Sequence, residues 1–503
     1  MSEVVAYTRE GNVGVISVNY PPVNALSHAV RAGLVAALEQ GQKDAEADIL
    51  LLVCEGRTFI AGADIREFGK PLQEPGLPDV INAYESSDKP IVAAIHGTAL
   101  GGGLETALGC HYRVALPSAK VGLPEVKLGL LPGAGGTQRL PRLVGAQKAL
   151  EMITSGNFVG ARDALALGIV DAVEAGDDIR QVGLAYAQKL AGEGAPVRRV
   201  RDIADKVEAD KGSDVFDQFR AGLAKKARGL FSPFKCVDAV EAAFTLPFAE
   251  GLKRERELFK ECMESPQRAG LVHSFFAERE VSKVKGLAKD TPVREVKSVG
   301  IIGAGTMGGG IAMNFANVGI PATIVEVQQE ALDRGMAVIR RNYENSARKG
   351  KLTAEQVEER MGLIKTSLSY DDFRDVDLVI EAVFENMAVK KEIFAKLDEV
   401  CKPGAILASN TSTLDIDEIA SATKRPEDVV GMHFFSPANV MKLLENVRGS
   451  KTSDEVKATV MAVAKQIKKV GVMVGNCHGF VGNRMLHERG AEGQISLHDF
   501  FMP

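Results

Sequence analysis

The sequence predicts an α/β protein with two sheet-containing domains and a helical segment between them. Three observations support this prediction. Strand-like and helix-like stretches alternate in the first part of the chain, a strand-turn-helix-strand unit starts near residue 297, and the stretch between them is charged and rich in helix formers. At 503 residues the chain is too long for one hydrophobic core, since domains usually hold about 100 to 200 residues.

Composition excludes several classes of protein. Hydrophobic residues make up 45% of the chain and charged residues 25%, and the net charge of −5 gives no basic field that would attract nucleic acid. The six cysteines have no Cys-x-x-Cys spacing, so neither a disulfide framework nor a metal site is expected. No apolar run approaches the roughly 18 residues of a membrane span. We therefore expect a soluble intracellular protein in a reducing compartment.

The first domain is expected to alternate strand and helix. VGVISVNY at 13–20 alternates apolar and polar residues as a half-buried strand does, and ILLLVCEG at 49–56 and PIVAAIHG at 90–97 indicate further strands. AVRAGLVAALEQ, between the first two, repeats apolar residues at helical spacing.

Glycine gathers in three stretches of this domain, FIAGADIREF (59–68), LGGGLETALGCHYR (100–113) and VGLPEVKLGLLPGAGGTQRL (121–140). Such clusters occur where backbone N–H groups approach a ligand. The triple glycine follows a predicted strand and precedes a helix, so its N–H groups are expected to form an oxyanion hole. Glu105 begins that helix and Glu125 lies in a loop before a glycine-rich turn. Two carboxylates beside an oxyanion hole suit addition of water to an activated double bond.

These stretches, with NYPPVNALS at 19–27, resemble the signature segments of the enoyl-CoA hydratase (crotonase) family over residues 1–190. Because the helix dipole also favours an acidic residue in a first turn, the resemblance is what favours a catalytic Glu105. It implies a crotonase fold, a ClpP-like spiral, that hydrates a 2-trans-enoyl-CoA thioester to a 3-hydroxyacyl-CoA. Isomerase activity, which shifts a double bond between positions 3 and 2, stays open. The implied residues are the N–H groups of Ala63 and Gly102 on the thioester oxygen, and Glu105 and Glu125 on the water.

Residues 191–294 are expected to form a helical connector, because they are charged and poor in β-branched runs. After them, VGIIGAGTMGGGIAMNFANVGIPATIVEV predicts strand, glycine turn, helix and strand. Gly303, Gly305 and Gly308 fit G-x-G-x-x-G, and Glu326 ends the next strand, where a carboxylate bonds ribose hydroxyls and repels a 2′-phosphate. The cofactor is therefore expected to be NAD and not NADP.

The rest of this Rossmann domain, residues 295–478, resembles the 3-hydroxyacyl-CoA dehydrogenase family, with the resemblance running from 296 to 486. The segments that carry it are EAVFENMAVKKEIF (381–394), ASNTSTL (408–414) and GMHFFSPANVMKLLE (431–445). A lone histidine in an apolar run is otherwise more often a core residue. The resemblance implies that His433 takes the proton of the 3-hydroxyl as hydride leaves for NAD, and that Glu445 orients the imidazole. It also implies substrate contacts from Ser412 and Asn483, and a nicotinamide and ribose side lined by Glu385 and Lys390.

A hydratase domain followed by a dehydrogenase domain resembles the bifunctional enzymes of fatty-acid β-oxidation, in which one chain raises the local concentration of the shared intermediate. The alternative is a hydratase or Δ3,Δ2-enoyl-CoA isomerase whose C-terminal half binds NAD without turnover. A non-catalytic acyl-CoA-binding protein would have lost a glutamate or the glycine triplet. We expect a cytoplasmic enzyme, with a peroxisomal location as the alternative if the authentic C-terminus is missing. Self-association is left open.

Residues 479–503 are expected to be the start of a helical dehydrogenase domain that is truncated or aberrant. GFVGNRML resembles the start of a long helix, whereas HERGAEGQISLHDFFMP has no apolar period and is too short to bury a core. On this basis we expect His433 to be exposed to water, Asn483 to be poorly held, and oxidation to be weak or absent despite NAD binding. Exposed apolar surface would also favour aggregation.

Overall fold

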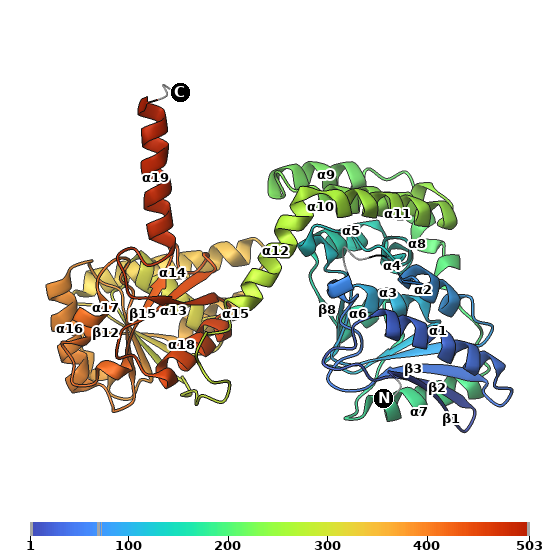
Figure 1. Ribbon diagram of the computed structural model, residues 1–503, viewed down its shortest axis with the longest axis horizontal. Helices are drawn as coiled ribbons and strands as arrows, with labels where there is room; N and C mark the ends of the chain where they lie inside the picture. Colours follow the sequence, from blue (N-terminus) through green and yellow to red (C-terminus); the bar gives the residue numbers. More distant parts are fainter. Residues whose placement is uncertain (1–3, 68–70, 72, 500–503) are drawn as a thin grey trace. The chain divides into compact units, whose positions relative to one another are not determined.

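The computed structural model describes residues 4–67, 71 and 73–499, and it confirms the predicted α/β class. The chain divides into two compact units, Met1–Phe275 and Phe276–Pro503. Each unit builds its own β-structure and surrounds it with helices (Figure 1).

A six-stranded sheet organises the first unit. Its strands follow the order β1-β2-β3-β4-β6-β9, with β1 antiparallel to β2 and the others parallel. β3 is buried along its whole length, as expected for a parallel strand covered on both faces. The strands predicted at 13–20, 49–56 and 90–97 are confirmed as β2, β3 and β4. The bounds are β1 (Val5–Glu10), β2 (Val13–Val18), β3 (Ile49–Cys54), β4 (Ile91–Ile95), β6 (Tyr112–Ala115) and β9 (Ala172–Val173), and a smaller sheet joins β5 (Thr98–Leu100), β7 (Lys120–Gly122) and β8 (Val159–Gly160).

Helices cover both faces of the larger sheet. The helix predicted between the first two strands is confirmed as α1 (His28–Lys43), which buries Leu34 and Leu38 in the main core. α7 (Ile179–Gly192) closes the opposite face with Leu184 and Leu190. The elements that carry site residues are η1 (Ile65–Glu67), α2 (Leu77–Glu85), α3 (Gly102–Gly109), η2 (Glu125–Leu128) and α4 (Gly136–Val144), followed by α5 (Ala146–Ser155) and α6 (Ala161–Ala166).

The expected connector is helical, and most of it packs on the first unit. α10 buries Cys236, Val237 and Val240 completely, in the same hydrophobic core as the strands. α11 adds Leu258 and Cys262 to that core, so these two helices are a structural part of the first unit. The bounds are η3 (Val200–Asp202), α8 (Asp205–Asp210), α9 (Val215–Lys226), α10 (Ser232–Thr245), α11 (Phe248–Glu264) and α12 (Pro266–Glu280).

The second unit is a doubly wound Rossmann domain. Its sheet has the order β12-β11-β10-β13-β14-β15-β16-β17, and the strands from β12 to β15 are parallel. β16 is antiparallel to β15 and parallel to β17. The strands are β10 (Val299–Ile302), β11 (Ala322–Val325), β12 (Ile364–Ser367), β13 (Leu378–Glu381), β14 (Ile406–Ser409), β15 (Val429–Phe434), β16 (Leu443–Arg448) and β17 (Val470–Gly475). The helices are α13 (Thr306–Ala316), α14 (Gln329–Arg348), α15 (Ala354–Gly362), η4 (Tyr370–Phe373), α16 (Met387–Val400), α17 (Ile416–Ala420), η5 (Pro426–Asp428), α18 (Asp454–Gln466) and α19 (Gly482–Asp499).

α19 differs from the expectation for the C-terminal segment. The polar run after Leu486 continues the helix that begins at Gly482, and the helix extends to Asp499. Helical hydrogen bonds are local, so a segment without an apolar period still forms them. Side chains from Arg484 to Ile495 are exposed, and residues 500–503 lie outside the described part of the chain.

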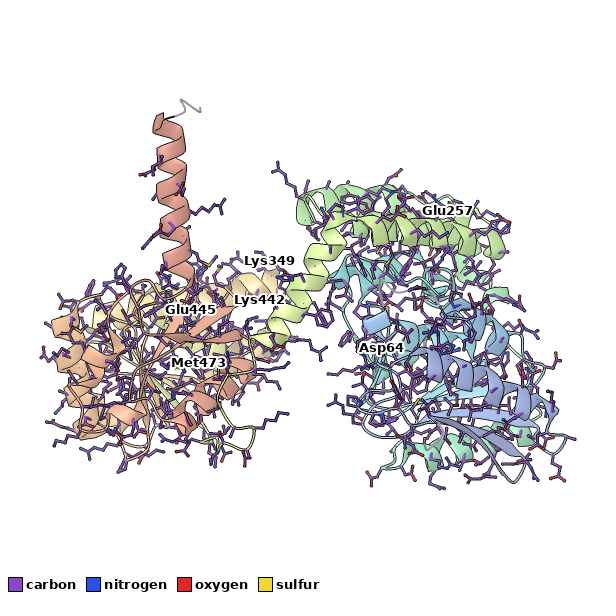
Figure 2. All side chains as sticks on the ribbon, in the orientation of Figure 1. Asp64, Glu257, Lys349, Lys442, Glu445 and Met473 are labelled. Atoms are coloured by element: carbon purple, nitrogen blue, oxygen red, sulfur yellow. The ribbon has the colours of Figure 1, made fainter. Side chains whose placement is uncertain are left out.

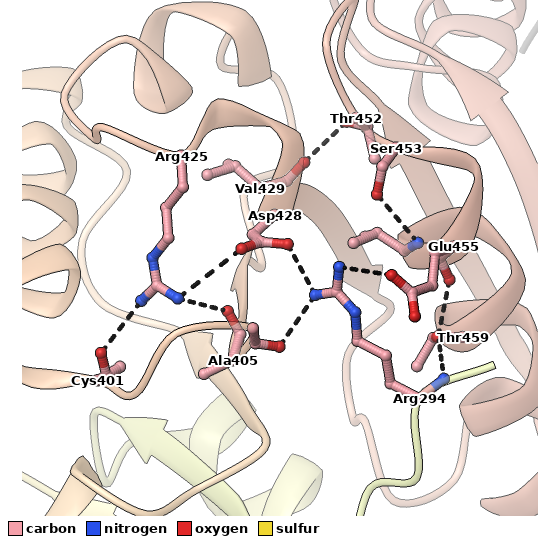
Figure 3. Close-up of polar contacts among 12 residues, drawn as sticks. Arg294, Cys401, Ala405, Arg425, Asp428, Val429, Thr452, Ser453, Glu455 and Thr459 are labelled. Carbon is pink, nitrogen blue, oxygen red and sulfur yellow. Dashed lines mark hydrogen bonds and ion pairs between the residues drawn. The ribbon is translucent and has the colours of Figure 1, made fainter. Parts of the chain in front are cut away.

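Arg294 fastens the segment that leads into the Rossmann sheet (Figure 3). Its guanidinium contacts Asp428 at 2.7 Å and Glu455 at 3.0 Å, and it donates to the carbonyl oxygen of Gly404 at 2.9 Å. Its backbone N–H donates to Thr459 Oγ1 at 2.9 Å. Arg294 thus joins the segment before β10 to the loop before β14, to η5 and to α18.

We expect Arg294→Ala to lower the free energy of unfolding of the second unit by about 1 to 2 kcal/mol, because the largely buried Asp428 loses a charged donor. Arg340→Ala is the control, since the Arg340–Glu358 pair lies on the surface and should contribute nothing measurable. The measurement is urea unfolding of both variants. Equal stability of the two would contradict the anchoring role.

Two candidate active sites

The first candidate site is a cavity of about 820 Å³ in the first unit. It opens where α3, η2 and the turn before α4 meet the loop that contains Ala63. α11 closes part of its wall with Arg256, Phe259 and Met263. The apolar lining comes mainly from Leu26, Leu77, Leu128, Leu130, Phe259 and Met263.

The N–H groups of Ala63 and Gly102 lie beside each other at this cavity. Gly102 is the first residue of α3, so its N–H has no partner within the helix. A Cβ atom added to Gly102 would lie 3.5 Å from the Ala63 nitrogen. Within the described part of the chain neither N–H donates a hydrogen bond, so both are free to bind a ligand oxygen.

The side chains of Glu105 and Glu125 both line the cavity, and Glu105 is buried whereas Glu125 is half-buried. Oε1 of Glu105 accepts hydrogen bonds from the N–H groups of Ala134 and Gly136, each at 2.8 Å. Oε2 of Glu125 is buried and has no hydrogen-bond partner among the described residues. Oε1 of Glu125 would lie 2.8 Å from a Cβ at Gly101, so this carboxylate approaches the backbone where only glycine leaves room.

The environments of the two carboxyls differ. Burial raises the pKa of Glu105, although the N–H groups of Ala134 and Gly136 and the Arg139 guanidinium oppose the rise. Burial, and then the negative charge of Glu105, raise the pKa of Glu125 well above its ordinary value. Glu125 therefore holds its proton more tightly than Glu105, which is the arrangement that an acid and a base in one site require.

Sequence reasoning missed a third carboxylate, the buried Glu255 of α11. Its Oε1 accepts from the Gly135 N–H at 2.7 Å, and its Oε2 accepts from the Thr137 N–H at 3.0 Å and from Thr137 Oγ1 at 2.5 Å. Burial and then the charge of Glu105 raise its pKa to about 8. Glu255 sits in KRERELFKE, which by pattern indicates a solvated charged face, so no local signal could have found it.

The second candidate site starts at the glycine turn between β10 and α13. Gly303 has a φ of +101°, and a Cβ at Gly303 would lie 2.8 Å from the carbonyl oxygen of Ala382. A Cβ at Gly308 would lie 1.9 Å from the carbonyl oxygen of Gly303. Gly305 has open space around it, with no atom within 4 Å of an added Cβ. Oε2 of Glu326 accepts from the Ala304 N–H at 3.0 Å, so the carboxylate lies at the turn.

Glu385 and Lys390 belong to a hydrogen-bonded network at the carboxyl ends of β13 and β14. Lys390 is fully buried and contacts both oxygens of Glu381, at 2.7 and 2.9 Å, and Glu385 at 3.5 Å. Glu385 accepts from Thr411 Oγ1 and from the Ser412 N–H, each at 2.7 Å. Lys390 is thus enclosed by carboxylates. Glu381, which sequence reasoning did not single out, is the residue that holds it.

His433 and Glu445 face each other across β15 and β16. The antiparallel register pairs them directly, and His433 Nδ1 lies 2.8 Å from Glu445 Oε2. Glu445, labelled in Figure 2, accepts at Oε1 from the Val481 and Gly482 N–H groups, at 3.2 and 2.8 Å. Burial opposes ionisation of Glu445, but these hydrogen bonds and the one with His433 outweigh it and lower the pKa of Glu445.

The expectation that His433 is exposed to water is wrong. The residue is 4% exposed, because the rings of Phe435 and Phe480 lie against the imidazole with centroids at 4.4 and 5.7 Å. Ser412 and Asn483 are half-buried. Ser412 belongs to the loop after β14, which meets β15 where the Phe434 N–H donates to Asn410 Oδ1 at 2.8 Å, and Asn483 follows the glycine that binds Glu445.

The glycine turn fits a dinucleotide. The open backbone at Gly305 leaves room for a phosphate at the start of α13, and the carboxylate of Glu326 lies at the same turn, where it can accept from a ribose hydroxyl. Among the described residues, no helix is long and apolar enough to cross a membrane. The same residues contain no group of histidine, cysteine and acidic side chains that could hold a metal ion.

Comparisons with known proteins match both halves of the chain. The family described as enoyl-CoA hydratase/isomerase matches residues 8–219, and the family described as 3-hydroxyacyl-CoA dehydrogenase, NAD binding domain, matches residues 298–477. A peroxisomal bifunctional enzyme of Danio rerio is 47% identical over 94% of this chain and 66% of its own length. The Homo sapiens enzyme of that name is 43% identical over 96% of this chain and 67% of its own.

A plant protein and one solved structure are also similar to this chain. A peroxisomal fatty acid beta-oxidation multifunctional protein of Arabidopsis thaliana is 40% identical over 94% of this chain and 67% of its own. The chain thus spans about two thirds of the length of these relatives. The solved structure of a (S)-3-hydroxybutyryl-CoA dehydrogenase from Ralstonia eutropha is 39% identical to this chain in the matched region. The match covers 41% of this chain and 74% of the dehydrogenase chain, with a TM-score of 0.41.

Two adjacent glycines of α13 give a test of the cofactor turn. Gly308→Ala should destabilise the second unit by about 1 to 3 kcal/mol and weaken NAD binding, because the added methyl group meets the Gly303 carbonyl. Gly309→Ala is the control, since its methyl group would make only ordinary contact with Ile339 at 3.4 Å. Urea unfolding and NAD titration by calorimetry check both variants, and equal NAD affinity in the two would contradict the described packing.

Proposed function

The chain belongs to the family of bifunctional enoyl-CoA hydratase and 3-hydroxyacyl-CoA dehydrogenase enzymes of fatty-acid β-oxidation, and from that premise we propose that it catalyses both reactions. The first unit hydrates a 2-trans-enoyl-CoA, and the second oxidises the 3-hydroxyacyl-CoA product with NAD. The observation that carries the first assignment is the buried Oε2 of Glu125, which has no partner among the described residues and lies near Glu105 and two N–H groups that donate to none of those residues.

In the hydration step, Glu105 takes a proton from water as the water oxygen bonds to C3 of the enoyl group. The electron pair of the double bond moves toward the thioester, whose oxygen is held by the N–H groups of Ala63 and Gly102. C2 then takes the proton of Glu125. The raised pKa of Glu125 supports its role as the acid, and the two N–H groups on Glu105 support its role as the base.

In the oxidation step, His433 takes the proton of the 3-hydroxyl group. Glu445 fixes the imidazole through Nδ1 and leaves Nε2 to face the substrate. When bound at the glycine turn, NAD supplies the acceptor for the hydride that leaves C3. Ser412 and Asn483 are proposed to contact the substrate, and Glu385 with Lys390 to shape the nicotinamide and ribose side.

The weak oxidation expected from the sequence depended on an exposed His433. Because the imidazole is buried and paired with Glu445, we propose that the second unit turns over and does not only bind NAD. The same glutamate pair also leaves double-bond isomerisation open as a side activity of the first unit. The names of the relatives support a peroxisomal location over a cytoplasmic one, and self-association stays a prediction.

The test is one assay of the purified chain with a short enoyl-CoA and NAD. Loss of the conjugated thioester absorbance reports hydration, and NADH absorbance reports oxidation. Both signals are expected. Loss of the conjugated absorbance without NADH would restrict the proposal to the first unit, and the absence of both signals would overturn it.

Glu105→Gln and Glu125→Gln should each lower hydration about 10²-fold or more, because an amide neither accepts nor supplies the transferred proton. NADH formation from added 3-hydroxyacyl-CoA should stay at the wild-type rate in both variants, which serves as their control for folding. Wild-type hydration in either variant would remove that residue from the mechanism.

His433→Gln should show the reverse pattern. NADH formation should fall about 10²-fold or more, because the base for the hydroxyl proton is lost. Hydration by the first unit should be unchanged. Stopped-flow measurement of NADH formation from a 3-hydroxyacyl-CoA checks the prediction, and a retained rate would show that another group accepts the proton.

A further inference from the structure

Four consecutive N–H groups at the start of α4 are shared between two carboxylates. Those of Ala134 and Gly136 donate to Glu105, and those of Gly135 and Thr137 donate to Glu255. Successive N–H groups along the turn therefore donate in alternation to Glu105 and to Glu255, and the two carboxylates bind the turn from different sides. A shift of this turn would move the donors of Glu105 and Glu255 together.

Glu255 comes from α11, which also lines the hydratase cavity through Arg256, Phe259 and Met263. Its side chain is buried, and a smaller cavity of about 270 Å³ lies between it, α2 and the turn. Removing a carboxylate from water costs several kcal/mol unless hydrogen bonds compensate for it. Glu255 meets this cost with three hydrogen bonds from the turn, donated by the Gly135 N–H, the Thr137 N–H and the Thr137 hydroxyl.

We propose that Glu255 is a positioning residue of the hydratase site, which fixes the turn at 134–137 so that Glu105 is held in its reactive orientation. The inference rests on the proposed hydratase function. It makes α11 part of the site, although the helix lies outside the stretches that carry the hydratase signature. A misplacement of about 1 Å is enough to cost about 10²-fold in rate, so small shifts of this turn matter.

The charge of Glu255 also acts on the acid of the pair. Glu255 raises the pKa of Glu125, after the larger effects of burial and of Glu105. The ionisable groups around Glu255 are Asp79 on α2 and Arg256 on α11, which line the same smaller cavity, Glu105 on α3, which raises the pKa of Glu255, and Glu125 on η2, whose pKa Glu255 raises. Glu255 is ionised above about pH 8, and in that range loss of its charge should lower the pKa of Glu125. The alkaline limb of the hydration profile, where Glu125 loses its proton, should then move to lower pH.

The experiment compares Glu255→Gln with Glu257→Gln in the full chain. Glutamine keeps the shape of Glu255 but has only one acceptor oxygen. It can therefore accept from Gly135 or from Thr137, but not from both. Glu257 lies on the same helix with an exposed side chain (Figure 2) and is the matched control. The measurements are kcat, KM and the pH profile for hydration of a short enoyl-CoA, with NADH formation as the folding control.

For Glu255→Gln we expect kcat to fall about tenfold to a hundredfold, KM to change less than about threefold, and the alkaline limb to move to lower pH. Glu257→Gln should match the wild type. Thr137→Val removes the hydroxyl that donates to Glu255 and accepts from Gln138 Nε2, and it should lower kcat by a few fold in the same way. If Glu255→Gln does not fold, Thr137→Val is the variant that tests the proposal.

Three outcomes would overturn the inference. A folded Glu255→Gln variant with wild-type kcat and pH profile would show that Glu255 does not position Glu105. A fall in kcat with an unmoved pH profile, or an unfolded Glu255→Gln variant together with wild-type kcat in Thr137→Val, would reduce Glu255 to a structural role. Absence of hydration by the wild-type chain would instead overturn the proposed function itself, and the inference with it.

Discussion

Burial of carboxylates among backbone N–H groups is the constraint on which both sites depend. A carboxylate taken from water must be paired or hydrogen-bonded, and free N–H groups at the starts of helices are the donors that a fold has available. Glu105 and Glu255 divide the N–H groups at the start of α4 between them. Glu125 lies nearby with a buried oxygen that has no partner within the described part of the chain, and this difference separates its proton affinity from that of Glu105.

The same constraint organises the second unit. Glu445 is held by two N–H groups at the start of α19, and this fixes the carboxylate that orients His433. Glu381 is held by the fully buried Lys390 and by Ser409 at the end of the next strand. In both units the backbone around a carboxylate is therefore as much a part of the site as the side chain that reacts.

The helices between the two families' matched regions link fold stability to chemistry. α10 supplies core residues to the first unit, and α11 supplies both part of the cavity wall and Glu255. A change in the packing of these helices would thus reach Glu105 through the turn before α4. The physical reason is that close-packed interiors transmit displacements instead of absorbing them.

Sequence reasoning found the local features because their signals are local. The close approach of Gly308 to the Gly303 carbonyl lies within a few residues, and Glu105 lies in the first turn of the helix that begins in the triple glycine. The strands were visible as short apolar stretches, but β2, which the alternation predicted to be half-buried, is buried at five of its six residues because it lies within the sheet. The burial of His433 was not visible, because Phe480 reaches it from a segment that lies 47 residues further along the chain.

By itself, then, the sequence determined the two α/β units and the glycine turn, and it predicted the glutamates beside the proposed oxyanion hole, because periodicity and glycine placement act over short stretches. Only the tertiary structure decided what those residues face. The β15 and β16 register sets His433 opposite Glu445, and the packing of α11 brings Glu255 to a turn 120 residues earlier in the chain. Such contacts form between surfaces that meet only on folding, and the local sequence around each residue does not indicate which residue it will contact.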